Sequence, residues 1–383
     1  MKFAQTTFNK IWDSVEGRQI VTQILNDPAL IKANHTFWTT KFRIDPQITP
    51  TNQDGEAIFI SRMRQLESGT LMDMRAPLGD SIVEDKGGIA YYSGAIPGFI
   101  SKGTAEKATE RDYKEKLFAQ FGDDALVYAY ATDVLQSKVD AANQTLSHLG
   151  AQLLSTGKII YAQGQGIQGN VLKADVPAKN FLKAGAKVWT DTSAKLLDQI
   201  VKMVEDIKDE TGVDMQYQLE VPKAIFQNCF LKNEQVIEWV RYVNVINNQP
   251  LPERLVLSRD MALNALASFE GLPTIVIVEE KQKDTLNGIV HGWKDGVAVL
   301  RPVGYAGYIR HSTVADTELF AKYGNSVNTY SFTPALNGLA TVRNSVIVNG
   351  NFKEWHTDIV MSAVPSLDEF LYHYIIDTTE ADS

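Results

Sequence analysis

Cysteine is almost absent from this sequence of 383 residues, in which Cys229 is the single example. It cannot form an intramolecular disulfide and has no second thiolate with which to bind a metal ion, so we expect a reducing compartment. Long hydrophobic runs are also missing, because stretches such as residues 125–131 reach only about half a dozen residues. The sequence therefore predicts neither a signal peptide nor a contact with a membrane.

Basic residues are fewer than acidic residues, since 37 basic and 46 acidic residues give a net charge of −9. Such a balance argues against a protein whose main task is to hold phosphate backbones, so a sequence-specific DNA reader is not expected. With 44% hydrophobic and 22% charged residues, the composition is that of a folded globular protein. At about 150 residues per domain, the length indicates two or three structural units.

Catalytic and metal-binding patterns are lacking as well. The histidines form no HxH or HExxH pair, and the sequence has no GxSxG elbow, Walker loop or EF-hand. Cys229 lies in an apolar, helical context that predicts a buried core thiol. We therefore expect no catalytic, cofactor-binding or metal-binding residues, no cofactor and no enzymatic activity. The six scattered histidines are His35, His148, His291, His311, His356 and His373.

One segment matches a nucleotide-binding pattern, because Gly164, Gly166 and Gly169 have the spacing GxGxxG. In dinucleotide-binding folds this loop opens a helix whose N-terminus meets the pyrophosphate. Here residues 170–177 have no helical apolar stripe. A glycine-rich turn is the favoured interpretation, and an α/β nucleotide-binding enzyme that uses Gly164–Gly169 stays as the least favoured alternative.

The first fifty residues have too little continuous apolar surface to form a domain. Apolar residues at helical spacing predict two short helices, over residues 8–15 and 20–25. Residues 35–43 are rich in Thr, Phe and Trp, which predicts a strand or extended segment. We expect residues 1–54 to be an N-terminal arm.

Glycine is concentrated in residues 54–103, which hold eight of the 26 glycines, a frequency about threefold that of the rest of the chain. Glycine permits the positive φ angles that tight turns need. The apolar pieces between these glycines are short, as in residues 57–60 and 89–92. The pattern favours a long hairpin-like extension over residues 55–110, with a loop-rich β region inside a domain as the alternative.

A single long helix is predicted over about residues 124–156. Asp123 and Asp124 can cap its start, and Gly157 suits a left-handed C-terminal cap. At 1.5 Å per residue this helix is roughly 50 Å long. Small residues on its apolar stripe favour a beam that lies across a sheet over a strand of a coiled coil. The stripe has spacings of three and four: Ala131, Leu135, Val139, Ala142, Leu146, Leu149 and Leu153.

The middle of the chain predicts a mixed α/β domain. Helical stripes cover residues 193–210, 222–231, 235–243 and 258–269, and buried-type strands cover residues 274–278 and 296–300. β-Branched and aromatic residues predict closing strands over residues 345–348 and 369–376.

Charge is distributed unevenly between the two ends. Residues 354–383 have seven acidic residues and no lysine or arginine, whereas residues 1–50 have six basic and four acidic residues. The acidic end is either a solvated surface or a patch that meets the basic arm of a neighbouring molecule. The sequence leaves both interpretations open.

The order of these parts, with several short stretches, resembles the major capsid proteins of tailed bacteriophages, particularly the lambda-like branch. The likeness extends over nearly the whole chain, although each stretch alone is only moderately specific. The stretches are residues 26–30 (NDPAL) leading to Phe37 and Trp38, 150–158 (GAQLLSTGK), 271–277 (GLPTIVI), 296–304 (GVAVLRPVG) and 363–367 (AVPSL).

This resemblance implies an α+β capsid fold and a shell protein rather than an enzyme. Its parts would be the N-terminal arm (1–54), the extended loop (55–110), a peripheral domain with a spine helix (111–190), an axial domain (191–344) and closing strands that return to the peripheral domain (345–383). Such subunits assemble into pentamers and hexamers around double-stranded DNA, as the icosahedral head of a virion formed in the bacterial cytoplasm. Implied partners are copies of the chain, a portal, decoration proteins and packaged DNA.

The sequence departs from some family members in having its arm-like pattern within the first ten residues. Those members begin with a helical scaffolding segment, so the resemblance here implies a separate scaffolding protein, or a segment already removed. The residues needed for covalent cross-linking or proteolytic maturation cannot be matched. An encapsulin-like compartment, which shares the fold and packages cargo enzymes, is the main alternative.

Overall fold

The structure is a computed structural model. It describes residues 36–51, 57–64, 89–96, 100–107, 135–160, 171–246, 257–284, 288–313, 331–349 and 352–382, with a few single residues before residue 36 and between residues 107 and 135.

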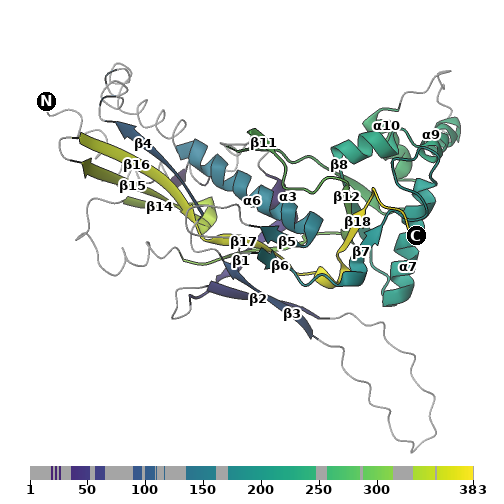
Figure 1. The fold of residues 1–383 in the computed structure, drawn as a ribbon, viewed down its shortest axis with the longest axis horizontal. Coiled ribbons are helices and arrows are strands. Elements are labelled where there is room, and N and C mark those ends of the chain that lie inside the picture. The colour runs from purple at the N-terminus through teal and green to yellow at the C-terminus, as the bar shows by residue number, and fades with distance from the viewer. Residues whose placement is uncertain are drawn as a thin grey trace, which may run out of the picture.

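The described elements form two sheet-containing ends, a long helix between them and a projecting hairpin (Figure 1). A mixed five-stranded sheet with helices around it lies at one end, and a four-stranded antiparallel sheet lies at the other. The long helix α6 (Gln136–Thr156) runs between them, and a hairpin of β2 (Ala57–Arg64) and β3 (Ile89–Ile96) projects to one side. This mixed content agrees with the predicted α+β class.

Helix α6 confirms the predicted long helix where the two can be compared. Every stripe position from Leu135 to Leu153 is buried, and Gly157 ends the helix with a φ of 68° in the left-handed region. Ala131 and the predicted start at residues 124–134 lie outside the described residues. The helix is also buried on its other faces, since Ala151 and Leu154 are fully covered, so it is a central beam of the fold.

The five-stranded sheet has the order β7-β18-β12-β8-β9. Strands β8 and β12 are buried along nearly their whole length, as their apolar runs require. The predicted strands 274–278 and 296–300 are present as β9 and β12, but only β12 is buried throughout, because β9 lies at the edge of the sheet. The strands are β7 (Phe181–Lys183), β18 (Tyr374–Asp377), β12 (Val297–Pro302), β8 (Tyr217–Pro222) and β9 (Thr274–Val278).

All four predicted helices of the middle section are present around this sheet. Gly212 ends the first with a φ of 65°, and the Ser258 side chain caps the last by accepting from the Met261 N–H at 3.3 Å. These helices are α7 (Leu196–Thr211), α8 (Lys223–Ile225) continued by a π turn (Phe226–Phe230), α9 (Glu234–Ile246) and α10 (Arg259–Leu266).

The remaining strands build smaller sheets. The four-stranded sheet runs β14-β15-β16-β4, a three-stranded sheet runs β1-β13-β17, and β5 and β10 pair antiparallel with β6 and β11. Their bounds are β14 (Ser331–Ala335), β15 (Ala340–Asn349), β16 (Phe352–Met361), β4 (Ile100–Lys107), β1 (Phe42–Ile48), β13 (Gly307–His311), β17 (Ala363–Leu367), β5 (Lys158–Ile160), β6 (Val171–Lys173), β10 (Gln282–Asp284) and β11 (Gly288–Val290). Short 3₁₀ turns are Ala178–Asn180, Leu336–Gly338 and Phe370–Tyr372.

Residues 36–49, which we call the strap, differ from the predicted extended arm. They begin with helix α3 (Phe37–Lys41), in which the Thr39 and Thr40 hydroxyls donate to backbone carbonyls three residues earlier, and only then enter β1. Phe37, Trp38 and Phe42 are buried against the chain's own core. The expected arm over residues 1–54 is therefore wrong for the strap, whose few apolar side chains suffice because α6 supplies the opposing surface.

The indole of Trp38 shows how closely the strap sits on α6. Its Nε1–H donates to Asn143 Oδ1 at 2.8 Å, and both groups are buried. Two helical turns after Asn143, Gly150 leaves room for the ring of Phe42, because a Cβ at this glycine would lie 2.8 Å from the ring. The strap and the helix are therefore fitted to each other.

Two predicted boundaries also change. Residues 100–107 belong to the four-stranded sheet as β4, rather than to the extended loop predicted over residues 55–110, because they pair with β16. Strand β18 lies inside the five-stranded sheet and does not return with β15 to β17. Side-chain periodicity identifies strands but does not tell which partner each strand finds.

Among the helices that the structure describes, none combines the length and the apolar character that a membrane span requires.

Replacing Leu149 with alanine should lower the free energy of unfolding by about 2–5 kcal/mol, because this stripe side chain is 5% exposed and its loss leaves a cavity. Urea denaturation measures the change. Ser137→Ala on the exposed side of α6 is the control, with an expected change below about 0.5 kcal/mol. Equal stability of both variants would show that the stripe is not core.

Candidate assembly surface and its buried supports

The β2–β3 hairpin has one buried and one exposed apolar face. Phe59, Ser61 and Tyr92 point inward and are at most 3% exposed, whereas Ile58 and Ile60 on the opposite face are 49% and 50% exposed. Tyr91 on β3 adds to the outer face with 69% exposure. An alternating strand that is apolar on both faces is suited to contacts on both, so the outer face is a candidate surface for another protein chain.

The inner face is fixed to the end of β17. Tyr92 Oη accepts from the Leu367 N–H at 2.7 Å, and Ser61 Oγ donates to Asp368 Oδ1 at 2.8 Å. The Tyr92 ring also meets those of Phe59 and Phe370 edge to face. Burial raises the pKa of the Tyr92 hydroxyl and of the Asp368 carboxyl. These hydrogen bonds and ring contacts therefore hold the strands of the hairpin against the end of β17.

A second exposed apolar group lies at the end of α9. Tyr242, Val245 and Ile246 are three and four residues apart, so they share one side of the helix, and they are between 56% and 60% exposed. Trp239 behind them packs on Phe269. This end of the five-stranded part is thus a further surface that the described residues of the chain leave uncovered.

A buried cluster of charges links the strap to the five-stranded sheet. The Glu220 carboxylate on β8 is fully buried and accepts from Lys41 Nζ at 2.8 Å and from Arg301 Nη2 at 2.6 Å. Burial acts to raise the pKa of Glu220, but the two cations hold it below its usual range. Because each charge needs the others in a dry interior, the cluster fixes α3, β8 and β12 relative to one another.

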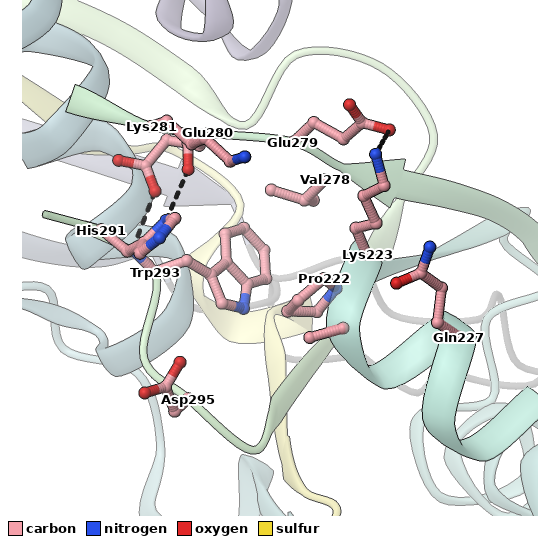
Figure 2. A pocket seen from close by; sticks show the side chains of 11 residues that line it. Pro222, Lys223, Gln227, Val278, Glu279, Glu280, Lys281, His291, Trp293 and Asp295 are labelled. Atoms are coloured by element: carbon pink, nitrogen blue, oxygen red, sulfur yellow. Dashed lines mark hydrogen bonds and ion pairs between the residues drawn. The ribbon is translucent and has the colours of Figure 1, made fainter. Parts of the chain in front are cut away.

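A cavity of about 390 Å³ lies beside the start of α8 (Figure 2). Two of its carboxylates are already engaged, since Glu279 pairs with Arg259 and Lys223, and the Glu280 carboxylate accepts from the Gly292 N–H at 2.9 Å. Burial raises the pKa of Glu280. Glu279 and Glu280 are thus held in contacts with the chain's own groups.

The residues that the sequence singled out do not converge on a site. Cys229 is buried, and burial raises its pKa to about 11, which makes it a poor nucleophile. Among the described residues, no three His, Cys, Asp or Glu side chains are grouped as metal ligands. The segment Gly164–Gly169 lies outside the described residues, but the strand β6 follows it, where a dinucleotide-binding loop requires a helix.

Comparison with solved structures shows what this architecture is similar to. A protein of an E. coli CFT073 prophage, assigned as its capsid protein, matches with a TM-score of 0.55 and 15% identity, over 94% of this chain and 98% of that one. The chain has the phage capsid fold.

Two further matches have lower TM-scores. A phage-related protein of Bordetella bronchiseptica RB50 gives 0.48 at 14% identity, covering 94% of this chain and 96% of that one. The capsid protein of cyanophage A-1(L) gives 0.45 at 12% identity, covering 90% and 93%. No protein-family model and no curated protein sequence matches the chain. With the prophage protein, the phage capsid fold is shared over 94% of this chain at 15% identity.

Replacing Glu220 with glutamine should destabilise this phage capsid fold by about 3–5 kcal/mol, because Lys41 and Arg301 would stay buried without their carboxylate. The free energy of unfolding in urea measures the effect. Glu279→Gln is the matched control, since its pairs are nearly half exposed and should contribute less than about 1 kcal/mol. Similar losses in both variants would contradict the role of the buried cluster.

Stability should also fall as the pH is lowered from 6.5 to 4, because of His373. This ring is buried, its Nε2 is 2.7 Å from the Leu154 carbonyl oxygen, and burial lowers its pKa from 6.5 to about 4. The unfolded chain takes up the proton first, so His373 contributes a loss of about 3 kcal/mol by pH 4. Unfolding free energies across this range measure it, and a His373→Gln variant with the same pH profile would contradict it.

Proposed function

We propose that this chain is a structural major capsid protein that self-assembles into pentamers and hexamers, forming an icosahedral shell around double-stranded DNA. The observation that carries the proposal is the phage capsid fold, which the chain shares over nearly its whole length with the prophage protein. The role is structural, and it needs no catalytic residue, metal ion or cofactor.

The exposed faces support this role. A shell subunit must meet several copies of itself, and closed rings require a surface on one side of the subunit to bind a different surface on another side. The outer face of the β2–β3 hairpin, with Ile58 and Ile60, and the apolar end of α9 are two separate surfaces of this kind. We propose that both are covered by neighbouring subunits in the shell.

We also propose how the described parts correspond to capsid domains. The β2–β3 hairpin serves as the base of the extended loop, α6 with the four-stranded sheet serves as the peripheral domain, and the five-stranded sheet with α7 to α10 serves as the axial domain. Residues before the strap serve as the arm. The basic lean of residues 1–50 and the acidic residues 354–383 would make early assembly weaker as salt rises.

The further partners of this proposal are a separate scaffolding protein, a portal, decoration proteins and the packaged DNA, with assembly in the bacterial cytoplasm and a final place in the virion. The encapsulin-like alternative shares the fold but not the content of the shell. The solved structures reported above favour a phage role over that alternative.

Electron microscopy of the purified protein, alone and with the head proteins encoded beside it, tests the proposal. Closed icosahedral shells built from rings of five and six subunits are the expected result. Shells that hold a cargo enzyme in place of DNA and a portal would support the encapsulin-like alternative. A protein that stays monomeric under all these conditions would contradict the capsid role.

Lysine at Ile58 and Ile60 together should reduce the yield of shells at least about tenfold, because covering the outer hairpin face would then bury two charges. Both side chains are half exposed in the subunit, so its melting temperature should hardly change. Sedimentation velocity measures the assembled fraction. Valine at both positions keeps the face apolar and is the control; assembly of the lysine variant at the control's level would show that this face is not an interface.

A further inference from the structure

Arg310 on β13 contacts the strap and the support of the hairpin at the same time. Its Nη1 pairs with Asp45 Oδ2 on β1 at 2.5 Å, and its Nη2 pairs with Asp368 Oδ1 at 3.1 Å. Its Nε donates to Ser366 Oγ on β17 at 3.1 Å. All three nitrogens of the guanidinium are therefore engaged, and each contacts a different residue: Asp45, Asp368 or Ser366.

The contact with Asp368 leads directly to the hairpin. Asp368 Oδ1, which pairs with Arg310, is the same oxygen that accepts from Ser61 Oγ on β2 at 2.8 Å. The guanidinium carbon also lies 5.9 Å from the ring centre of Phe59, the next inward residue of β2. Arg310 thus positions the inner face of the hairpin through one shared carboxylate oxygen and one aromatic ring.

The contact with Asp45 leads to the strap. Asp45 is buried, its Oδ1 accepts from the Gln47 N–H at 2.9 Å, and its backbone oxygen lies 3.0 Å from His311 Nε2. Between residues 37–49 of the strap and the described side chains of the β2–β3 hairpin, no hydrogen bond or ion pair is formed directly. Arg310 is their common partner, and its side chain is only 16% exposed, so water does not replace either bond easily.

We infer that Arg310 is a positioning residue that makes the seating of the strap and the seating of the β2–β3 hairpin one cooperative event. Asp45 holds the guanidinium so that Nη2 faces Asp368, and Asp368 in turn holds Ser61. Loosening the strap therefore loosens the hairpin, and the reverse holds as well, because coupling between two sites is reciprocal. This inference deepens the proposed function, in which the hairpin carries a contact surface, by giving the strap control over the position of that surface.

Hydrogen exchange of the unassembled subunit tests the coupling without any shell. In Asp45→Asn, which removes the charge but keeps the side-chain shape, amides of β2 and β3 should exchange about tenfold faster, while amides of β12 keep their rates. Asp45 forms no hydrogen bond or ion pair with the described residues of the hairpin, so a merely local role for it predicts no change there. In an Arg310→Gln background, the same Asp45→Asn substitution should add nothing further.

Asp358→Asn is the matched control, since it removes the charge from a part-buried pair with Arg343 at 2.9 Å in the four-stranded sheet. It should leave the hairpin amides unchanged. Unchanged hairpin exchange in Asp45→Asn, or an equal rise in β12, would overturn the inference. If Asp45→Asn speeds hairpin exchange but the protein never forms shells, the role of Arg310 stands and the proposed function is refuted. If Asp45→Asn leaves hairpin exchange unchanged but the protein forms normal shells, the proposed function stands and the role of Arg310 is refuted.

Discussion

A single carboxylate that cannot reach water holds the centre of this fold together. Glu220 lies on β8, between β12 and β9 in the five-stranded sheet, and it pairs with Arg301 from β12 and with Lys41 from the strap. Removing Glu220 would leave both cations buried without their shared carboxylate, so the strap and β12 both depend on β8 for the partner of a buried charge. Such a cluster adds little net stability. It favours the one arrangement of the strap, β8 and β12 in which the charges meet, because any other arrangement leaves a buried charge without its partner.

The same logic of shared polar partners continues toward the hairpin. From the strap, Asp45 leads to Arg310, then to Asp368 and finally to Ser61 on β2. Apolar contacts also join the parts, as where the Tyr92 ring of the hairpin meets Phe370, and the bond from Ser61 to Asp368 adds a polar contact that orients the hairpin. For a protein proposed to build a closed shell, the relative placement of its parts matters as much as the stability of each, because small angular errors add up around a ring.

Local elements were readable from the sequence to a large degree. The stripe of α6, the helices with Gly212 and Ser258 at their ends, and the apolar strand β9 all follow from side-chain period and capping residues close in the chain. The hairpin followed from glycine content. The strap could not be predicted in the same way, because its threonines and aromatic residues suggest an extended segment. The α6 surface on which it becomes helical and buried lies about 100 residues away in the sequence.

The supports of the candidate surface were equally hidden from sequence reasoning. Ser61 and Asp368 are 307 positions apart, and Lys41 and Glu220 are 179 apart. Neither pair has a local signature, since a serine, an aspartate or a lysine is ordinary at any exposed position. The predicted boundary at residue 110 failed for a related reason, because β4 is defined by its pairing with β16 and not by its own composition.

The place of β18 has a consequence for the order in which the chain folds during synthesis. This strand fills the position between β7 and β12, although β7 precedes it by almost two hundred residues. The ribosome therefore releases β7, β8, β9 and β12 well before the strand that joins β7 to the rest, and the sheet closes only after residue 377 has emerged. Until then β7 and β12 present open edges, so the nascent chain needs to avoid strand pairing with other chains during this interval.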